Sequence, residues 1–158
     1  MTPRFAARRL GYLPTMSGTI DDLVQLAVDA AVEARGRAYA PYSGFTMGAA
    51  VVSLDRDVVR GALVENVSLG LAICSERVAI FAAVTERVEP VVLAVCSKRT
   101  GDALTFPCGA CLQVALEIGG PDLLVVAVDP DGVTDRAVLA DLLPRAPKIH
   151  SPSSVDDA

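Results

Sequence analysis

The chain has 158 residues, of which 52% are hydrophobic, and its mean hydropathy is +0.44. This length suits a single domain, and the apolar content is enough for a sizeable core. The formal net charge of −5, with 14 lysines and arginines against 19 acidic residues, argues against nucleic-acid binding, because phosphate contacts need a basic surface.

No segment of the sequence is predicted to enter a membrane. No apolar run approaches the roughly 20 residues that a membrane-spanning helix needs. Residues 1–16 contain Arg4, Arg8 and Arg9 but no apolar stretch of the kind found in a secretory signal. We therefore expect a cytoplasmic protein that acts on a small soluble molecule, with neither a membrane nor a nucleic acid as its partner.

Both ends of the chain differ in composition from its centre. Residues 1–17 mix Pro, Gly and Arg without periodicity, and residues 146–158 are rich in Pro, Ser and Asp. Such segments cannot bury enough apolar area to become ordered. We expect a flexible extension over 1–17, one folded domain over 18–145 and a disordered tail over 146–158.

The first predicted element is a helix from Thr19 to about Ala38. Apolar residues recur in it at steps of three and four, and Asp21 and Asp22 occupy the first turn, where the helix dipole favours acids. Residues 40–44 break this helix. Two strands over 45–54 and 58–64 then form a predicted hairpin around a polar turn.

The second half of the chain alternates helices with apolar strands. Pro90 and the pair Gly119-Gly120 provide stop signals for two of the helices. The predicted elements are, in chain order, a helix over 74–87, a strand over 91–96 buried on both faces, a helix over 108–118, a buried strand over 123–128, a turn over 129–132 and a short helix over 136–143. Helices that cross over between buried strands predict an α/β fold, with a single mixed sheet of about five strands sandwiched between helices.

Two short cysteine motifs carry the chemistry of the sequence. The first is Cys74-Ser75-Glu76-Arg77, and the second is Pro107-Cys108-Gly109-Ala110-Cys111. In a reducing compartment, cysteines at such spacings indicate metal binding or catalysis more often than disulfides. Three thiol ligands leave one coordination position of a zinc ion open for water or substrate, which is typical of catalytic zinc sites.

The predicted helices give these cysteines a suitable electrostatic setting. Cys74 lies at or near the start of one helix, and Cys108 and Cys111 lie in the first turn of another, where unpaired N–H groups favour the thiolate that binds zinc. Three thiolates leave a net charge of −1 on the site, and Arg77 is the nearest candidate to offset it.

Glu76 is predicted to be a neighbour of the metal and not a ligand. It follows Cys74 by two residues, which displaces it by about 200° around a helix. A carboxylate next to a zinc-bound water can serve as general acid and base. The fourth cysteine, Cys96, lies within an apolar run and is expected to be a small buried residue; a structural zinc site that uses it as the fourth ligand is the plainer alternative.

A zinc ion held by three cysteines, a Glu that is not a ligand and a Pro-Cys-x-x-Cys motif also occur together in nucleobase deaminases. At these motifs the sequence resembles the small, homotetrameric cytidine deaminase family, over roughly Ile20 to Pro144. Two more stretches carry the resemblance: Tyr39-Ala40-Pro41-Tyr42-Ser43-Gly44-Phe45 and Val64-Glu65-Asn66-Val67-Ser68.

The resemblance implies a three-layer α/β/α fold, a homotetramer and one Zn²⁺ per chain. It assigns the metal to Cys74, Cys108 and Cys111, and it makes Glu76 the proton shuttle. Contacts to the substrate are assigned to Phe45, which would stack near the pyrimidine, and to Glu65, which would bond the sugar. The implied reaction is hydrolysis at C4 of a cytosine nucleoside, which yields the uracil nucleoside and ammonia.

The sequence departs from the family pattern mainly on the substrate side. Leu63 stands where the family usually has an Asn that bonds the ribose hydroxyl, and Leu69 stands where many members have a Tyr. Leu112 replaces the usual Arg after the last cysteine, and Pro147 lies where a Phe is common. An Asn-to-Leu exchange removes a donor and an acceptor, so we hypothesise that the sugar is altered or less polar than ribose.

Several alternatives remain open at this point. The chain could deaminate an aminoacyl-nucleoside antibiotic of the blasticidin S type, bind a nucleoside without turnover, or be a redox or structural Cys-x-x-Cys protein. Deamination of bases in nucleic acid is disfavoured by the acidic charge. Phe45 could equally be a core residue, and Glu65 could serve as a cap or ion-pair partner at the sheet edge.

Overall fold

The computed structural model describes residues 19–147. The predicted extension over 1–17 lies outside the described residues, as does the predicted tail apart from residues 146 and 147. The domain boundaries at 18 and 145 therefore stay predictions. Across residues 19–147, every helix is too short or too polar to span a bilayer.

Helix α1 (Ile20–Arg35) begins at a capping box. The Thr19 hydroxyl accepts the Asp22 N–H at 3.4 Å, and the Asp22 carboxylate accepts the Thr19 N–H at 2.7 Å. These two bonds satisfy N–H groups that the helix itself leaves unpaired. The helix was predicted to reach Ala38, but it ends at Arg35 because Gly36, a poor helix former, follows it.

The five strands form one mixed sheet in the order β2-β1-β3-β4-β5. Strands β3 and β4 pair in parallel, and all other neighbours are antiparallel. The strands are β1 (Met47–Val52), β2 (Val58–Ala62), β3 (Val92–Ser97), β4 (Leu124–Val128) and β5 (Thr134–Val138). Their bounds confirm the predicted hairpin and both predicted buried strands, although the hairpin strands are shorter than predicted.

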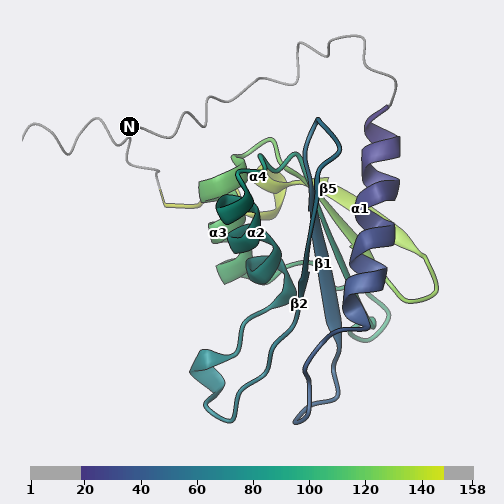
Figure 1. Cartoon of the computed structure of the whole chain (residues 1–158), viewed down its shortest axis with the longest axis vertical. Coiled ribbons are helices and arrows are strands. Elements are labelled where there is room, and N and C mark those ends of the chain that lie inside the picture. The colour runs from purple at the N-terminus through teal and green to yellow at the C-terminus, as the bar shows by residue number, and fades with distance from the viewer. Residues whose placement is uncertain (1–18, 148–158) are drawn as a thin grey trace, which may run out of the picture.

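Helices cover both faces of this sheet, which confirms the predicted three-layer architecture (Figure 1). Helix α1 lies on one face, and the remaining α-helices lie on the other. Those on the second face are α2 (Ser75–Glu86), α3 (Gly109–Gly119) and α4 (Leu139–Leu142), and a 3₁₀ turn, η1 (Leu69–Leu71), precedes α2. Each face has its own apolar cluster, because β1, β3 and most of β4 are buried on both sides.

The predicted helix over 136–143 is wrong in its first part. Residues 134–138 form strand β5, which pairs with β4 after a turn at Asp129–Gly132, and only Leu139–Leu142 are helical. The free edge of β4 supplies backbone partners that a single sequence does not display. Strand β5 is mostly exposed, as a charged edge strand should be.

Two glycines let helices lie directly on the sheet. A Cβ at Gly48 in β1 would overlap backbone atoms of Arg35 in α1. A Cβ at Gly61 in β2 would overlap the Ser75 carbonyl oxygen and the Ala79 nitrogen in α2. The first turn of α2 is therefore seated on β2 at a distance that only glycine permits.

We expect Gly61→Ala to lower the free energy of unfolding by about 3 kcal/mol, because the new methyl group meets backbone that cannot move aside locally. Urea unfolding followed by circular dichroism measures this loss. Gly70→Ala is the matched control, since a Cβ there meets nothing within 4 Å, and we expect it to change stability by less than about 0.5 kcal/mol. Equal losses in both variants would contradict the close approach at Gly61.

Candidate metal and catalytic site

The loops that carry the motif residues gather at one end of the sheet, where strands begin or end. In the β1–β3 ladder Met47 pairs with Ser97, and in the β1–β2 ladder Gly48 pairs with Ala62. The start of β1 and the ends of β2 and β3 therefore lie at the same end of the sheet. The loop before β1 and the segment around η1 extend from this end, at the bottom of the view in Figure 1.

Two helix starts bring three cysteines together. Cys74 is the N-cap of α2, Cys108 is the N-cap of α3, and Cys111 lies in the first turn of α3. Their sulfur atoms all lie within 4.8 Å of one another, and the Cys108 and Cys111 sulfurs are 3.6 Å apart. Sulfurs about 2.3 Å from one zinc in a tetrahedron are about 3.8 Å apart, so this group fits zinc.

Cys74 is held by the backbone on both sides. Immediately before it, Ile73 and Val64 exchange two backbone hydrogen bonds, of 2.9 and 3.0 Å, which close the loop that contains η1. Immediately after it, α2 begins on Gly61. The Cys74 side chain makes no capping bond to its own helix, so its sulfur is available to a metal.

The thiols of Cys74 and Cys111 influence each other's pKa. The hydrogen bond with Cys111 lowers the pKa of Cys74 to about 6, and Arg77 contributes to the lowering. The same contact, together with burial, raises the pKa of Cys111. The lowered pKa favours the thiolate of Cys74, which is the form of the side chain that binds a metal.

Arg77 lies where the predicted counter-charge is needed. Its Nη2 is 4.0 Å from the Cys74 sulfur and donates to the Ala72 carbonyl at 3.4 Å. Burial acts to lower the pKa of Arg77, but its contacts with Cys74 and Cys111 outweigh this effect and raise it. The guanidinium therefore stays charged beside the thiols. Its Nε is buried and has no partner within residues 19–147.

Glu76 is the second residue of α2 and is only 1% exposed. Its Oε2 accepts a hydrogen bond of 2.8 Å from the hydroxyl of Ser75, which is fully buried. In the described part of the chain, the residues that could hold a metal ion are the three cysteines without Glu76. The role of Glu76 as a neighbour of the metal stays a prediction. Sequence reasoning missed Ser75, whose only signal was a small polar residue next to the acid.

Cys96 lies apart from this group. It is 1% exposed in β3 and packs in the cluster beneath α1, whereas α2 and α3 cover the opposite face of the sheet. The alternative of a structural zinc site with Cys96 as its fourth ligand is therefore not supported by the geometry.

The predicted substrate-side residues fall into two groups. Phe45 packs partly buried against an apolar cluster that includes Met47 and Leu63, and Leu63 is 8% exposed. Glu65 instead fastens the turn before β1: its carboxylate accepts the N–H groups of Tyr42 and Ser43 and the Ser43 hydroxyl.

These contacts, with the Ser43 hydroxyl first, hold the pKa of Glu65 below its ordinary value. The plainer roles of Phe45 as a packed residue and of Glu65 as a cap are therefore present in the structure. Their contacts with a substrate stay predictions.

The other departures from the family pattern lie at different depths. Leu112 is 6% exposed and packs in the apolar cluster beneath α2 and α3. Leu69 is 86% exposed in η1, and Pro147 is exposed at the end of the described chain.

Comparison with known proteins gives a consistent family. Residues 22–127 match the family model described as the cytidine and deoxycytidylate deaminase zinc-binding region. A cytidine deaminase of Halalkalibacterium halodurans is 39% identical over 122 residues, which cover 77% of this chain and 92% of that protein. A cytidine deaminase of Mycobacterium tuberculosis is 40% identical over 116 residues, covering 73% of this chain and 83% of that protein.

Solved structures of small bacterial cytidine deaminases have the same fold. The crystal structure of the enzyme from Burkholderia pseudomallei superposes with a TM-score of 0.72 at 42% identity and covers 77% of this chain and 97% of that one. The enzyme from Mycobacterium tuberculosis superposes with a TM-score of 0.67 at 36% identity and covers 80% of this chain and 98% of that one.

We expect Cys74→Ala, Cys108→Ala and Cys111→Ala each to lose tightly bound zinc, because two thiolates and water hold the ion far more weakly than three thiolates do. Cys96→Ala, the matched control, should keep one zinc per chain. Elemental analysis after gel filtration measures the metal content. Zinc loss in Cys96→Ala with zinc retained in Cys108→Ala would refute this ligand set.

Proposed function

Because the chain belongs to the cytidine and deoxycytidylate deaminase family, we propose that it hydrolyses the 4-amino group of a cytosine nucleoside. It is a zinc-dependent hydrolytic deaminase with one Zn²⁺ per chain. The observation that carries the proposal is the meeting of three thiols at two helix starts, beside a buried glutamate. A redox or structural Cys-x-x-Cys protein would need neither Cys74 nor Glu76 in this arrangement.

Cys74, Cys108 and Cys111 would hold the zinc as thiolates. When bound, zinc acts as a Lewis acid that makes water nucleophilic near neutral pH. The N-terminal dipoles of α2 and α3 stabilise the thiolates, and Arg77 offsets the net charge that three thiolates leave on a dication.

Glu76 would move the protons of the reaction. Its carboxylate takes a proton from the attacking water and delivers it to N3 of the cytosine ring as C4 becomes tetrahedral. It then transfers the second proton, from the new hydroxyl group, to the departing amine, so that water and a cytosine nucleoside become ammonia and a uracil nucleoside. The Ser75 hydroxyl at 2.8 Å restricts the carboxylate to one orientation while it does so. A nucleoside-binding protein without turnover would not need a buried carboxylate here.

We expect Glu76→Gln to lower kcat by about a thousandfold, because the amide cannot accept the proton of water, whereas the metal content should stay at one zinc per chain. Ammonia release and loss of the 4-amino chromophore measure the rate. Glu86→Gln, at the far end of the same helix, is the control and should keep normal turnover. A Glu76→Gln variant that holds zinc and still deaminates at the normal rate would overturn the proposed role.

The sugar of the substrate is a separate part of the proposal. Leu63 is buried against Phe45 and Met47, and its side chain offers neither a donor nor an acceptor to a hydroxyl group. This observation favours a cytosine nucleoside whose sugar is altered or less polar than ribose, including an aminoacyl-nucleoside antibiotic of the blasticidin S type.

Turnover of cytidine, deoxycytidine and blasticidin S tests which sugar the site accepts. We expect cytidine not to be the best substrate. We also expect Leu63→Asn to raise kcat/KM for cytidine about tenfold relative to the best substrate of the unmodified chain, because the Asn restores one hydrogen bond. Leu54→Asn, on the turn between β1 and β2, should leave the ratio unchanged. Cytidine as clearly the best substrate of the unmodified chain would reject the altered sugar.

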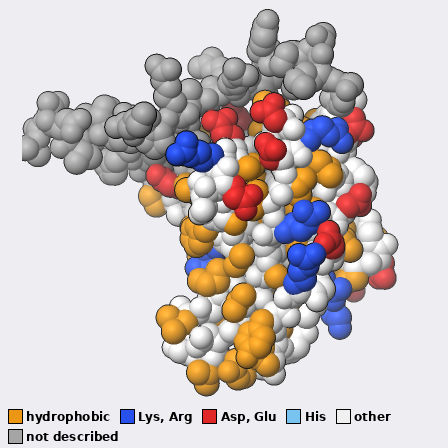
Figure 2. All heavy atoms as spheres, viewed as in Figure 1, with side chains coloured by type: hydrophobic (Ala, Val, Ile, Leu, Met, Phe, Trp, Pro, Cys, Tyr) orange, Lys and Arg blue, Asp and Glu red, His pale blue; other side chains and the backbone are white. Residues whose placement is uncertain are grey.

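A homotetramer is part of the proposal. Large apolar side chains are exposed around η1 and on α2, and Figure 2 shows apolar side chains gathered on the lower part of the molecule. They are Val67 (80% exposed), Leu69 (86%), Leu71 (65%) and Phe81 (50%). Such a surface is typical of contact between subunits. Sedimentation of the full chain determines the number of subunits.

The free thiols and the acidic charge support the remaining parts of the proposal. All four cysteines are unpaired, which suits a reducing compartment such as the cytoplasm. The net charge of −5 favours a free nucleoside over a nucleic acid as the substrate.

A further inference from the structure

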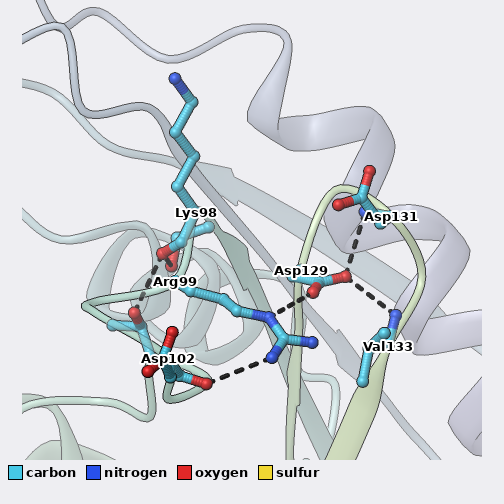
Figure 3. A network of polar contacts seen from close by, with 8 residues as sticks. Lys98, Arg99, Asp102, Asp129, Asp131 and Val133 are labelled. Atoms are coloured by element: carbon cyan, nitrogen blue, oxygen red, sulfur yellow. Dashed lines mark hydrogen bonds and ion pairs between the residues drawn. The ribbon is translucent and has the colours of Figure 1, made fainter.

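Asp129 is a buried carboxylate outside the metal site. The residue is only 2% exposed, and its Oδ1 accepts the N–H groups of Asp131 and Val133 at 3.0 and 2.9 Å. Its Oδ2 accepts a bond of 2.7 Å from Nε of Arg99, which is the one cation paired with it within residues 19–147 (Figure 3). Arg99 also holds the pKa of Asp129 below its ordinary value. The mechanism above uses neither residue.

The pair lies where two parallel strands separate. Cys96 pairs with Val128, so Ser97 at the end of β3 lies next to Asp129, which follows β4. From Ser97 the chain continues as the loop 98–107, which ends at the N-cap Cys108, and from Asp129 it turns into β5. Arg99 therefore joins the loop that leads to the metal ligand Cys108 to the turn that begins at Asp129.

The loop 98–107 is braced internally but has few links to the rest of the molecule. Nη1 of Arg99 donates to the Asp102 carbonyl at 3.2 Å, and the Thr105 hydroxyl donates to the Lys98 carbonyl at 3.1 Å. Across residues 19–147, the bond between Arg99 and Asp129 is the only hydrogen bond from this loop to an element other than the end of β3. Its other anchors are apolar side chains such as Phe106.

We propose that Arg99 and Asp129 are a positioning pair, which fixes the loop 98–107 so that Cys108 stays within coordination distance of Cys74. The proposal rests on the proposed function for its metal site. Without Arg99, the buried Asp129 carboxylate keeps only backbone partners and its charge is left unpaired, which favours opening of the turn toward water. The loop then loses its polar link to the turn after β4, and the helix start at Cys108 gains freedom.

Zinc release from the full-length, zinc-loaded protein tests this pair. We expect Arg99→Met and Asp129→Asn each to transfer zinc to a chromophoric chelator about tenfold faster than the unmodified chain, the lower end of what outer residues contribute to metal retention. Arg136→Met is the matched control, because it breaks an ion pair of the same 2.7 Å length, with Asp21, on an exposed surface. It should release zinc within twofold of the normal rate.

Two further measurements separate positioning from a general loss of stability. The double variant Arg99→Met/Asp129→Asn should release zinc no faster than either single variant, because both act on one contact. Arg99→Lys keeps the positive charge and should release zinc more slowly than Arg99→Met. It also provides a usable variant if Arg99→Met folds poorly. Amide exchange should increase in residues 98–108 and not in α1.

The outcomes distinguish this inference from the proposed function. If the unmodified chain holds no zinc or releases no ammonia, the proposed function fails. If it does both, and Arg99→Met and Asp129→Asn release zinc at the normal rate, the pair only stabilises the turn after β4 and the inference is overturned.

Discussion

The contact of the first turn of α2 with β2 at Gly61 is the constraint on which the site depends. Backbone meets backbone there, so the helix start cannot slide or tilt without a clash. Cys74 and Glu76 are thereby fixed relative to the sheet. The second helix start, at Cys108, is fixed differently, because the chain reaches it through a loop that leaves the end of β3. The metal group thus joins a helix seated backbone to backbone on the sheet to one that is held by its packed apolar side chains and by the loop before it.

The charge of the site is balanced mainly by residues of a single helical turn. Cys74, Glu76 and Arg77 bring a thiol, a carboxylate and a guanidinium into one place, and Ser75 between them bonds the carboxylate. Burial makes each of these groups dependent on the others, because an unpaired charge in such surroundings is costly. The dipole of α2 adds to the stabilisation of the thiol side.

Most of the fold and the metal group could be predicted from the sequence, because each has a local signature. Helix caps and apolar periodicity gave α1, α2 and α3 to within a few residues, and two cysteine motifs gave the three thiols. Strand β5 could not be found in this way, because its polar residues become a strand only beside the free edge of β4. The bond between Arg99 and Asp129 joins residues thirty positions apart and has no sequence pattern.

The arrangement at this end of the sheet has a consequence for how the substrate range of such a protein evolves. The thiols and the glutamate lie at the starts of α2 and α3, whereas Phe45, Leu63 and Glu65 lie in the segments before β1 and after β2. The side chains of Phe45 and Glu65 make their described contacts within these segments and the adjoining cluster, and not with the helix starts. On the proposed assignment of Phe45, Leu63 and Glu65 to substrate contacts, inherited changes in the two segments alter which nucleoside is accepted while the hydrolytic chemistry is retained.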